Sequence, residues 1–292
     1  TRLFVLAVAQ DGAEVQTGYS APGKSVGLEL FDLYPPKAVG EKAARQALTN
    51  LKARPAPAGT FPVVVGPGFG GVLFHEAVGH LLETTSVARK ASVLADKLGE
   101  VVASPAVTYI DDGTLPHAWG STEMDDEGRP TERTVLIEKG VLKSYMVDRL
   151  GHLLTGYPMT GSGRRQDYTF APTSRMRNTF LAPGEARVED LFAGIAFGLY
   201  AKEMGGGQVK PGSGEYNFAV QEGYIIRKGR IEEPVRGAML VGKGPETLMR
   251  VVAVAQDLEN APGMCGSLSG AVPEEVVQQL VLVAEIVVGG RA

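Results

Sequence analysis

The stretch Pro62-Val-Val-Val-Gly-Pro-Gly-Phe-Gly-Gly-Val-Leu-Phe-His-Glu-Ala-Val-Gly-His-Leu-Leu-Glu83 decides how the rest of the chain is interpreted. It predicts a short buried strand, a glycine-rich turn and an apolar helix that carries His75, Glu76 and His80. Two of the chain's four histidines therefore lie close together, with a carboxylate beside the first. Metal-assisted hydrolysis uses imidazoles that hold the metal and a carboxylate that takes a proton from metal-bound water.

The spacing of the two histidines sets a geometric condition on such a site. Side chains five positions apart on a regular helix point roughly 140° away from one another. Both imidazoles reach one metal only if the helix widens, as in a π bulge, or ends near Gly79. The pair alone also fits two histidines that are hydrogen-bonded in a core or cleft.

A catalytic zinc usually takes three protein ligands and leaves one position for water. Candidates for the third ligand are Glu83, His117, His152 and Cys265. A lone cysteine is more often an inert small hydrophobe. Because glycines on both sides of Met264-Cys265 let the backbone approach another element closely, Cys265 is favoured as the ligand.

Other polar and glycine-rich patterns are less specific. Gly66, Gly68 and Gly71 fit the dinucleotide-binding pattern G-x-G-x-x-G. Against it, Pro67 occupies the turn, and no second parallel strand ending in an acidic residue follows. The glycines are better interpreted as a tight turn that presents the histidines.

Candidate substrate-binding residues are Arg164, Arg165 and His117. Paired arginines can clamp a carboxylate or a row of carbonyls, and His117 shares with Trp119 a loop that can border a cleft. Surface or core positions are the alternatives for all of them. The acidic clusters at 111–112 and 125–127 are typical of solvated turns, with cation binding as the alternative.

Apolar periodicity gives the expected elements. Strands are predicted at 3–9, 25–33, 107–110, 134–138, 141–146, 216–220, 223–227, 238–241 and 279–288. Helices are predicted at 36–51, 86–98, 147–154, 187–193 and 245–255, with a loop at 260–270. Many hairpin-linked strands with scattered helices indicate an α+β fold with mainly antiparallel sheets.

Composition excludes several functions. A net charge of −4 gives no basic surface for nucleic acid, and no apolar run approaches the ~20 residues of a membrane span. A single cysteine excludes an intrachain disulfide and suits the cytoplasm, and no secretion signal is visible. We therefore expect neither nucleic-acid nor membrane partners.

Several segments resemble a known family. His75-Glu-Ala-Val-Gly-His80 resembles the HExxxH motif of the TldD/PmbA family, the so-called modulators of DNA gyrase. The resemblance extends in the same order over nearly the whole chain, at 103–105, 111–116, 125–128, 133–138, 163–166, 175–179, 222–224, 234–237 and 263–266.

This resemblance implies a cytoplasmic metalloprotease that acts on unfolded or peptide substrates. Zinc is held in such proteins by the residues that match His75, His80 and Cys265, and Glu76 matches the catalytic base. The PmbA type lacks this site and is the partner in a heterodimer. The chain therefore resembles the catalytic TldD type, with a PmbA-like partner or a homodimer expected.

Family members carry a further N-terminal domain, so residues 1–292 are expected to form the TldD-like C-terminal metalloprotease domain alone. The alternative is a non-catalytic, peptide-binding or scaffold subunit of a TldD/PmbA-type complex with a structural metal. A fourth protein ligand would indicate that alternative, whereas a water would indicate catalysis. Since a thiolate donates more charge than a third imidazole, we expect a slow protease.

Overall fold

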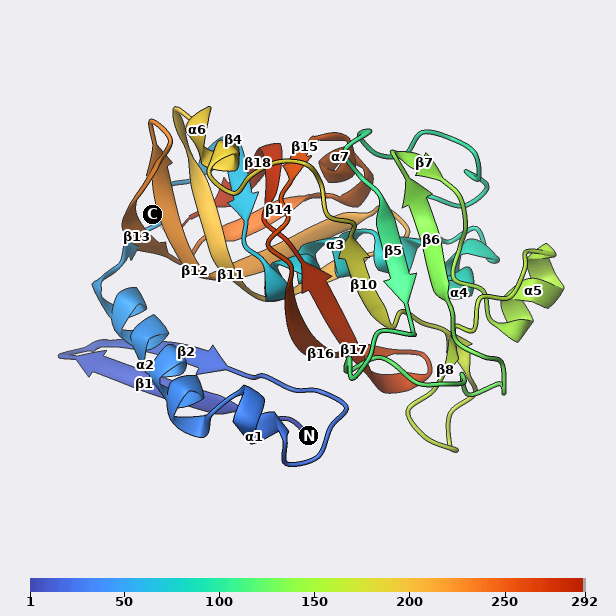
Figure 1. The fold of residues 1–292 in the computed structure, drawn as a ribbon. Helices are drawn as coiled ribbons and strands as arrows, with labels where there is room; N and C mark the ends of the chain where they lie inside the picture. The colour runs from blue at the N-terminus through green and yellow to red at the C-terminus, as the bar shows by residue number, and fades with distance from the viewer. Residues whose placement is uncertain (291–292) are drawn as a thin grey trace.

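The computed structural model describes residues 1–290 and shows an α+β protein built mainly from antiparallel strands (Figure 1). The larger sheet contains, in spatial order, β11 (Phe197–Lys210), β4 (Gly59–Val65), β18 (Val281–Gly289), β14 (Met239–Lys243), β12 (Glu215–Arg227), β13 (Arg230–Arg236) and β3 (Arg54–Pro55). A short strand, β15 (Val251–Val254), also pairs with β18. Because β11 pairs with β12 as well as with β4, five of these strands form a closed ring.

The second sheet has six strands and supplies the other side of the site. Its order is β16 (Glu259–Ser267), β17 (Gly270–Gln278), β10 (Asn178–Leu181), β5 (Tyr109–Asp112), β6 (Arg133–Glu138) and β7 (Val141–Leu142). β16 and β17 form a hairpin closed between Ser267 and Gly270. β16 therefore lies at the edge of this sheet.

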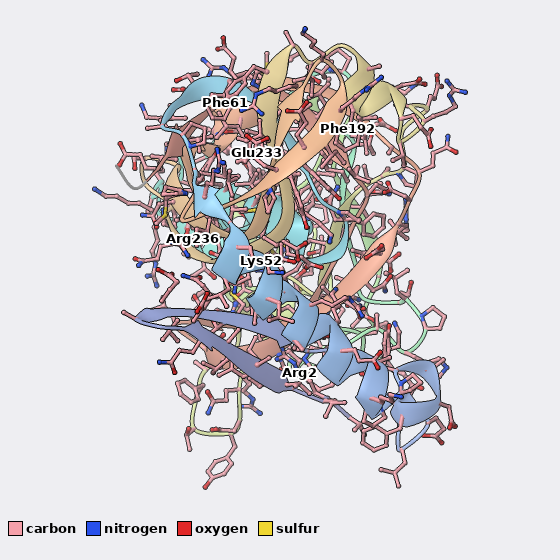
Figure 2. All side chains as sticks on the ribbon, turned by 90° about the vertical axis from the view of Figure 1, so that its left-hand side faces the viewer. Arg2, Lys52, Phe61, Phe192, Glu233 and Arg236 are labelled. Atoms are coloured by element: carbon pink, nitrogen blue, oxygen red, sulfur yellow. The ribbon has the colours of Figure 1, made fainter. Side chains whose placement is uncertain are left out.

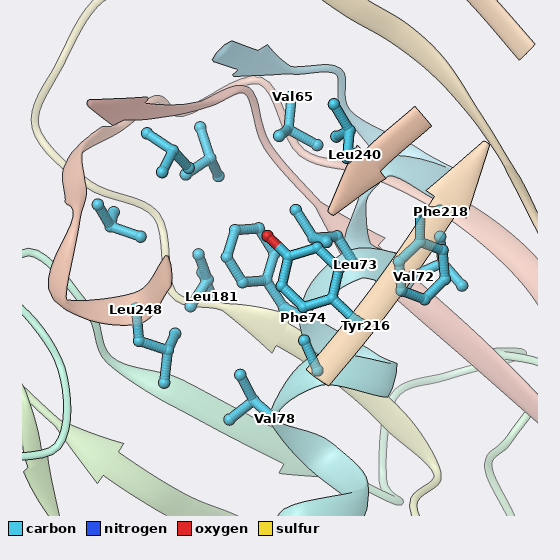
Figure 3. Close-up of a cluster of buried hydrophobic side chains, with 14 of the residues drawn as sticks. Val65, Val72, Leu73, Phe74, Val78, Leu181, Tyr216, Phe218, Leu240 and Leu248 are labelled. Atoms are coloured by element: carbon cyan, nitrogen blue, oxygen red, sulfur yellow. The ribbon is translucent and has the colours of Figure 1, made fainter. Parts of the chain in front are cut away.

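One hydrophobic core runs between the two sheets. The buried helix α3 (Val72–Ala77) places Leu73 and Phe74 against Val65 and Leu240 of the larger sheet (Figure 3). The same cluster extends into the six-stranded sheet through side chains such as Leu181. The segment that carries the histidines is therefore at the centre of the fold.

An N-terminal layer, residues 1–53, lies to one side of both sheets. It consists of the hairpin β1 (Val5–Asp11) and β2 (Glu14–Ser20), the short helix α1 (Leu30–Leu33) and α2 (Pro36–Lys52). Figure 2 shows α2 lying across the hairpin and ending at Lys52. The buried face of α2 (Val39, Ala43, Gln46, Ala47, Asn50) has helical spacing, and Pro36 occupies its first turn, a favoured position.

The remaining elements are short. They are α4 (Thr84–Val87), α5 (Arg149–Thr155), β8 (Gly163–Arg164), β9 (Thr173–Ser174), α6 (Asp190–Ala193) and α7 (Gly244–Met249). The Asp148 carboxylate caps α5 by accepting the Gly151 N–H at 2.9 Å. Gly156 ends the same helix in the left-handed region, as C-terminal glycines commonly do.

The fold class and several elements agree with the sequence prediction, including α2, α5, the β6–β7 hairpin and β18. Four predictions are wrong. Residues 25–33 form no strand because β1 already pairs with 14–20 across Gly12, whose φ is 57°. The helix expected at 86–98 ends at Val87, the one expected at 245–255 ends at Met249 before β15, and 260–270 forms the β16–β17 hairpin.

Candidate metal centre

The glycine-rich turn joins β4 to α3 by close backbone contact. The Gly66 N–H donates to Ala201 O at 2.8 Å, and a Cβ on Gly66 would lie 2.1 Å from Lys202 O. Gly68 has a φ of +63°, and Gly71 packs against Val276 and Gln278 of β17. These contacts support the tight-turn interpretation of the glycines. Atoms of β11 and β17 occupy the space that a side chain at Gly66 or Gly71 would need.

The helix that carries His75 ends before it reaches His80. α3 stops at Ala77, Val78 leaves helical geometry (φ −130°, ψ −51°), and a 3₁₀ turn follows at Gly79–Leu81. The predicted interruption near Gly79 is therefore present, but as a helix end rather than a π bulge. It brings the two imidazole rings to a centroid distance of 5.4 Å at an interplanar angle of 84°.

His75, Glu76, His80 and Cys265 form a group whose candidate ligand atoms all lie within 4.8 Å of one another. His80 Nε2 is 3.2 Å from Cys265 Sγ and 3.5 Å from Glu76 Oε2. Both histidines and the cysteine are buried, whereas the Glu76 side chain is 22% exposed. Two imidazoles, a thiol and a partly accessible carboxylate are donors that zinc prefers.

Carboxylates and a hydroxyl contact the two imidazoles from outside the group. Glu83 Oε2 lies 3.0 Å from His80 Nδ1, on the side of the ring that faces away from Cys265. His75 Nδ1 is 3.3 Å from Thr179 Oγ1, and His75 Nε2 is 2.8 Å from Glu274 Oε2. A partner on the nitrogen that faces away from the metal fixes the orientation and tautomer of a ligating histidine, as Glu83 can for His80. Both nitrogens of His75 have a partner, so a metal bound by His75 would replace one of these two contacts.

The other candidates for a third ligand lie elsewhere. Glu83 contacts the far nitrogen of His80 and is outside the four-residue group. His117 and His152 are exposed, and His152 Nδ1 is bonded to Tyr157 O at 2.7 Å. Glu274 was missed by sequence reasoning, although a Pro-Glu-Glu run inside a strand is an unusual pattern.

The charges around the group favour a bound cation. Burial disfavours a charged imidazole, yet the Glu274 carboxylate and Cys265 raise the pKa of His75 to about 10. The pKa of His80 is also raised, because Glu83 and Cys265 outweigh burial. Burial and Glu274 act to raise the pKa of Cys265, but both imidazoles lower it below its ordinary value. The buried Glu274 and Glu83 carboxylates thus favour a positive charge on the imidazoles, and a metal ion can supply that charge in place of the protons.

The three candidate substrate-binding residues are not part of this group. Arg164 is buried, and its guanidinium donates to Met176 O and, at 2.7 Å, to Pro273 O, so it is not available as a clamp. Arg165 is partly exposed and donates to Phe170 O at 3.4 Å. His117 is exposed, in a left-handed conformation with φ 59°.

The two acidic clusters have structural contacts. Asp111 and Asp112 are buried in β5 instead of lying in a solvated turn. Asp125 accepts the N–H groups of Glu127 and Arg129, both at 2.9 Å, and of Gly163 at 3.1 Å. This carboxylate therefore holds a loop together.

Comparison of the chain with known protein families identifies the class of protein to which this fold and this group of residues belong. The family model for the PmbA/TldA metallopeptidase C-terminal domain matches residues 58–290. The chain therefore belongs to this metallopeptidase family, as its motifs predicted.

Individual relatives agree with this membership. The chain is 41% identical to the "Metalloprotease TldD homolog" of Haemophilus influenzae, over 99% of this chain and 61% of that protein. It is 31% identical to the "Zinc metalloprotease TldD homolog" of Saccharolobus solfataricus, over 90% of this chain and 59% of the relative. The chain thus spans about three fifths of the length of these relatives.

Solved structures show the same fold. A Thermotoga maritima protein described as a candidate modulator of a DNA gyrase has a TM-score of 0.78 and 26% identity, over 99% of this chain and 62% of that one. TldE from Thermococcus kodakarensis has the same TM-score at 21% identity, which shows the fold alone. Within residues 1–290, no helix is both long and apolar enough to cross a bilayer.

Proposed function

We propose that the chain is the catalytic, zinc-binding part of a TldD-type metallopeptidase that hydrolyses unfolded or peptide substrates. The observation that carries this proposal is the group formed by His75, His80, Cys265 and Glu76, whose ligand atoms lie within 4.8 Å of one another. The family membership and the name of the Saccharolobus relative support zinc as the metal.

Each residue of the group has a distinct role in this proposal. His75, His80 and Cys265 would hold the metal. When bound, zinc supplies Lewis acidity that polarises a scissile carbonyl and lowers the pKa of water. Glu76 is the most accessible member, so its carboxylate would take the proton of the attacking water and deliver it to the leaving amine.

An extended substrate would reach the site along β16. This strand pairs with β17 on one side only, and Met264 and Gly266, which flank Cys265, are exposed. A peptide that pairs with such an edge is held by main-chain hydrogen bonds, which give affinity without strong sequence preference. Helical or side-chain-only recognition in a peptide complex would contradict this route.

A cleft of about 660 Å³ lies beside the first half of the same strand. Its walls come from the N-terminal layer, the glycine-rich turn and β16, and include Tyr19, Lys42, Phe69 and Pro262. Because successive residues of a strand advance ~3.3 Å, this cleft is roughly 10 Å from Cys265 along β16. It would accept substrate residues on one side of the scissile bond.

Family membership alone supports the following proposals about the whole protein. Residues 1–292 would be the C-terminal metalloprotease domain of a longer cytoplasmic protein. That protein would act with a PmbA-like partner subunit or as a homodimer. The thiolate ligand predicts slow turnover, so rapid digestion of folded proteins would count against this assignment.

A second function is favoured by one observation. Glu76 Oε2 lies close enough to His80 Nε2, at 3.5 Å, to be a fourth protein ligand. A site closed by four protein donors would be structural, and the chain would then be a non-catalytic, peptide-binding or scaffold subunit.

Metal analysis of Cys265→Ala tests the proposed ligand set. We expect wild type to bind one zinc ion per chain and Cys265→Ala to lose zinc and peptidase activity together. Met264→Ala, at the exposed neighbouring position, is the matched control and should keep its zinc. Full zinc content in Cys265→Ala would remove the cysteine from the ligand set.

A further inference from the structure

The two ligand histidines are each contacted by a buried carboxylate, and these carboxylates come from different elements. Glu83 follows the 3₁₀ turn and lies 3.0 Å from His80, whereas Glu274 lies in β17, 2.8 Å from His75. Two buried carboxylates near one site repel each other and need a compensating charge. A single side chain supplies that charge to both.

That side chain is Arg175, which is fully buried. Its Nε is 3.7 Å from Glu83 Oε1, and its Nη2 is 3.4 Å from Glu274 Oε1. The same Nη2 donates to the main-chain oxygen of Cys265 at 2.7 Å. One guanidinium therefore lies at ion-pair distance from the carboxylate that contacts each histidine, and it donates to the backbone of the cysteine.

The other donors of Arg175 hold the turn of the β16–β17 hairpin. Nη1 donates to Gly270 O at 3.0 Å and to Ser269 Oγ at 3.2 Å. The planar guanidinium group of an arginine carries several donors in a fixed arrangement, so it can make these contacts at the same time. A lysine ammonium is a compact point charge on a flexible stem, so it cannot reproduce them.

We propose that Arg175 is the positioning residue of the metal centre, orienting both histidines through Glu83 and Glu274 and setting the position of Cys265 through its carbonyl. This inference rests on the proposed metal site but not on peptidase activity. Arg175 connects segments that are far apart in the chain, so it sets the geometry of the ligands before the metal binds. Changes to such outer partners typically weaken metal affinity about 10- to 100-fold.

Zinc affinity of Arg175→Lys, measured by competition with a chelator, tests the proposal. We expect zinc binding to weaken about 10- to 100-fold, because the charge remains but the contacts to Glu83 and Glu274 are lost. The absorption spectrum of the cobalt(II)-substituted protein should also change, since its ligand-field bands report the geometry of the ligands.

Arg177→Lys is the matched control. Arg177 is equally buried and lies on the same segment, but its side chain donates to Gly161 O at 3.2 Å, Gly120 O at 3.3 Å and Thr122 Oγ1 at 2.8 Å. This variant should lose stability without a change in zinc affinity or cobalt spectrum. An equal loss of affinity in both variants would show a general effect of buried arginines and overturn the proposal.

Two further outcomes are decisive. If Arg175→Lys does not fold, Ser269→Ala is the alternative variant, because it removes one hydrogen bond of Arg175 without changing a proposed ligand. Ser269→Ala should weaken zinc binding severalfold. Unchanged zinc affinity in this variant overturns the proposal. Zinc-loaded wild type without peptidase activity would contradict the proposed function alone. Zinc-free wild type would contradict both, and wild-type affinity in a folded Arg175→Lys would contradict only this inference.

Discussion

Burial in the six-stranded sheet changes the pKa of a single residue, Asp111. It is buried in β5, and its Oδ1 accepts the Arg177 N–H at 2.8 Å. Burial raises the pKa of Asp111 to about 7, although the Arg177 N–H and guanidinium act in the opposite direction. This carboxyl group therefore takes up a proton within the physiological pH range.

The free energy of unfolding should depend on pH through Asp111. In the unfolded chain this group titrates near 3.8, so between about pH 4 and 7 the folded state binds more protons. Its contribution to stability is therefore lost as pH rises through that window. Asp111→Asn keeps an oxygen for the Arg177 N–H but cannot ionise.

Relative to wild type, Asp111→Asn should thus gain stability from pH 4 to 8, by an amount on the order of a few kcal/mol. Urea unfolding of both proteins across this range measures the difference. A constant difference between the two proteins would show that Asp111 does not titrate in this way.

The sequence was sufficient to predict which residue types gather at the site, but not the contacts that orient them. His75, Glu76 and His80 are neighbours in the chain, whereas Cys265 is 185 residues beyond His80 and was favoured from its glycine flanks. Arg175 and Glu274 have no local pattern that predicts their role. Their segments are brought together by the pairing of β10 with β17 and by the Glu275 N–H, which donates to Arg177 O at 3.0 Å.

The end of α3 is the element on which the geometry of the site depends. A Cβ on Gly79 would lie 1.9 Å from Met176 Sδ, and Met176 is itself fully buried. Glycine at position 79 therefore lets the 3₁₀ turn approach the Met176 side chain this closely. This close approach, together with the helix end, explains how a five-residue histidine spacing brings both rings to one site.

Gly79→Ala should destabilise the protein by about 1–3 kcal/mol, because the added Cβ overlaps the thioether of the buried Met176 and forces that side chain to shift within the core. The matched control is Gly40→Ala in α2, where an added Cβ has nothing within 4 Å. That change should stabilise the fold by ~0.5–1 kcal/mol through helix propensity. Thermal denaturation measures both, and equal melting temperatures would contradict the packing argument.

Elements with regular periodicity were predictable, and those shaped by tertiary contacts were not. α2 and the β6–β7 hairpin follow from their patterns and turn residues. β11 was missed because a glycine run interrupts its apolar residues, and β17 because buried glutamates occupy its centre. Glu274 is stabilised by contacts with Arg175 and His75, and Glu275 by the Trp119 N–H and Lys24, none of which the local sequence shows.

Across the whole molecule, the two large sheets share a core from which the N-terminal layer is excluded. All members of the two buried apolar clusters come from residue 56 onward. The layer is joined to the rest by polar contacts, such as Asn50 Nδ2 to Gln221 O at 2.9 Å, Tyr19 Oη to Met204 O at 3.1 Å and Lys42 to Glu203 at 2.8 Å. It is therefore the part of the molecule that should open most easily.

Hydrogen exchange should separate the layer from the sheets. Amides of β1, β2 and α2 should exchange through local opening, well before those of β4 and β18, which are strands of the closed ring paired on both sides. Mass spectrometry of peptides from these segments measures the order. Simultaneous exchange of both groups would show that the layer opens only with global unfolding.

The most direct test of the proposed catalytic metal centre is to measure the zinc content and peptidase activity of Glu76→Gln in the same preparation. The glutamine has nearly the same shape, but its amide cannot accept the water proton. The proposed roles predict one zinc ion per chain, as in wild type, and hydrolysis of an unfolded peptide reduced by about 10²-fold or more. Loss of zinc would make Glu76 a ligand of a structural site, and retained zinc with wild-type hydrolysis would show that Glu76 is not the base.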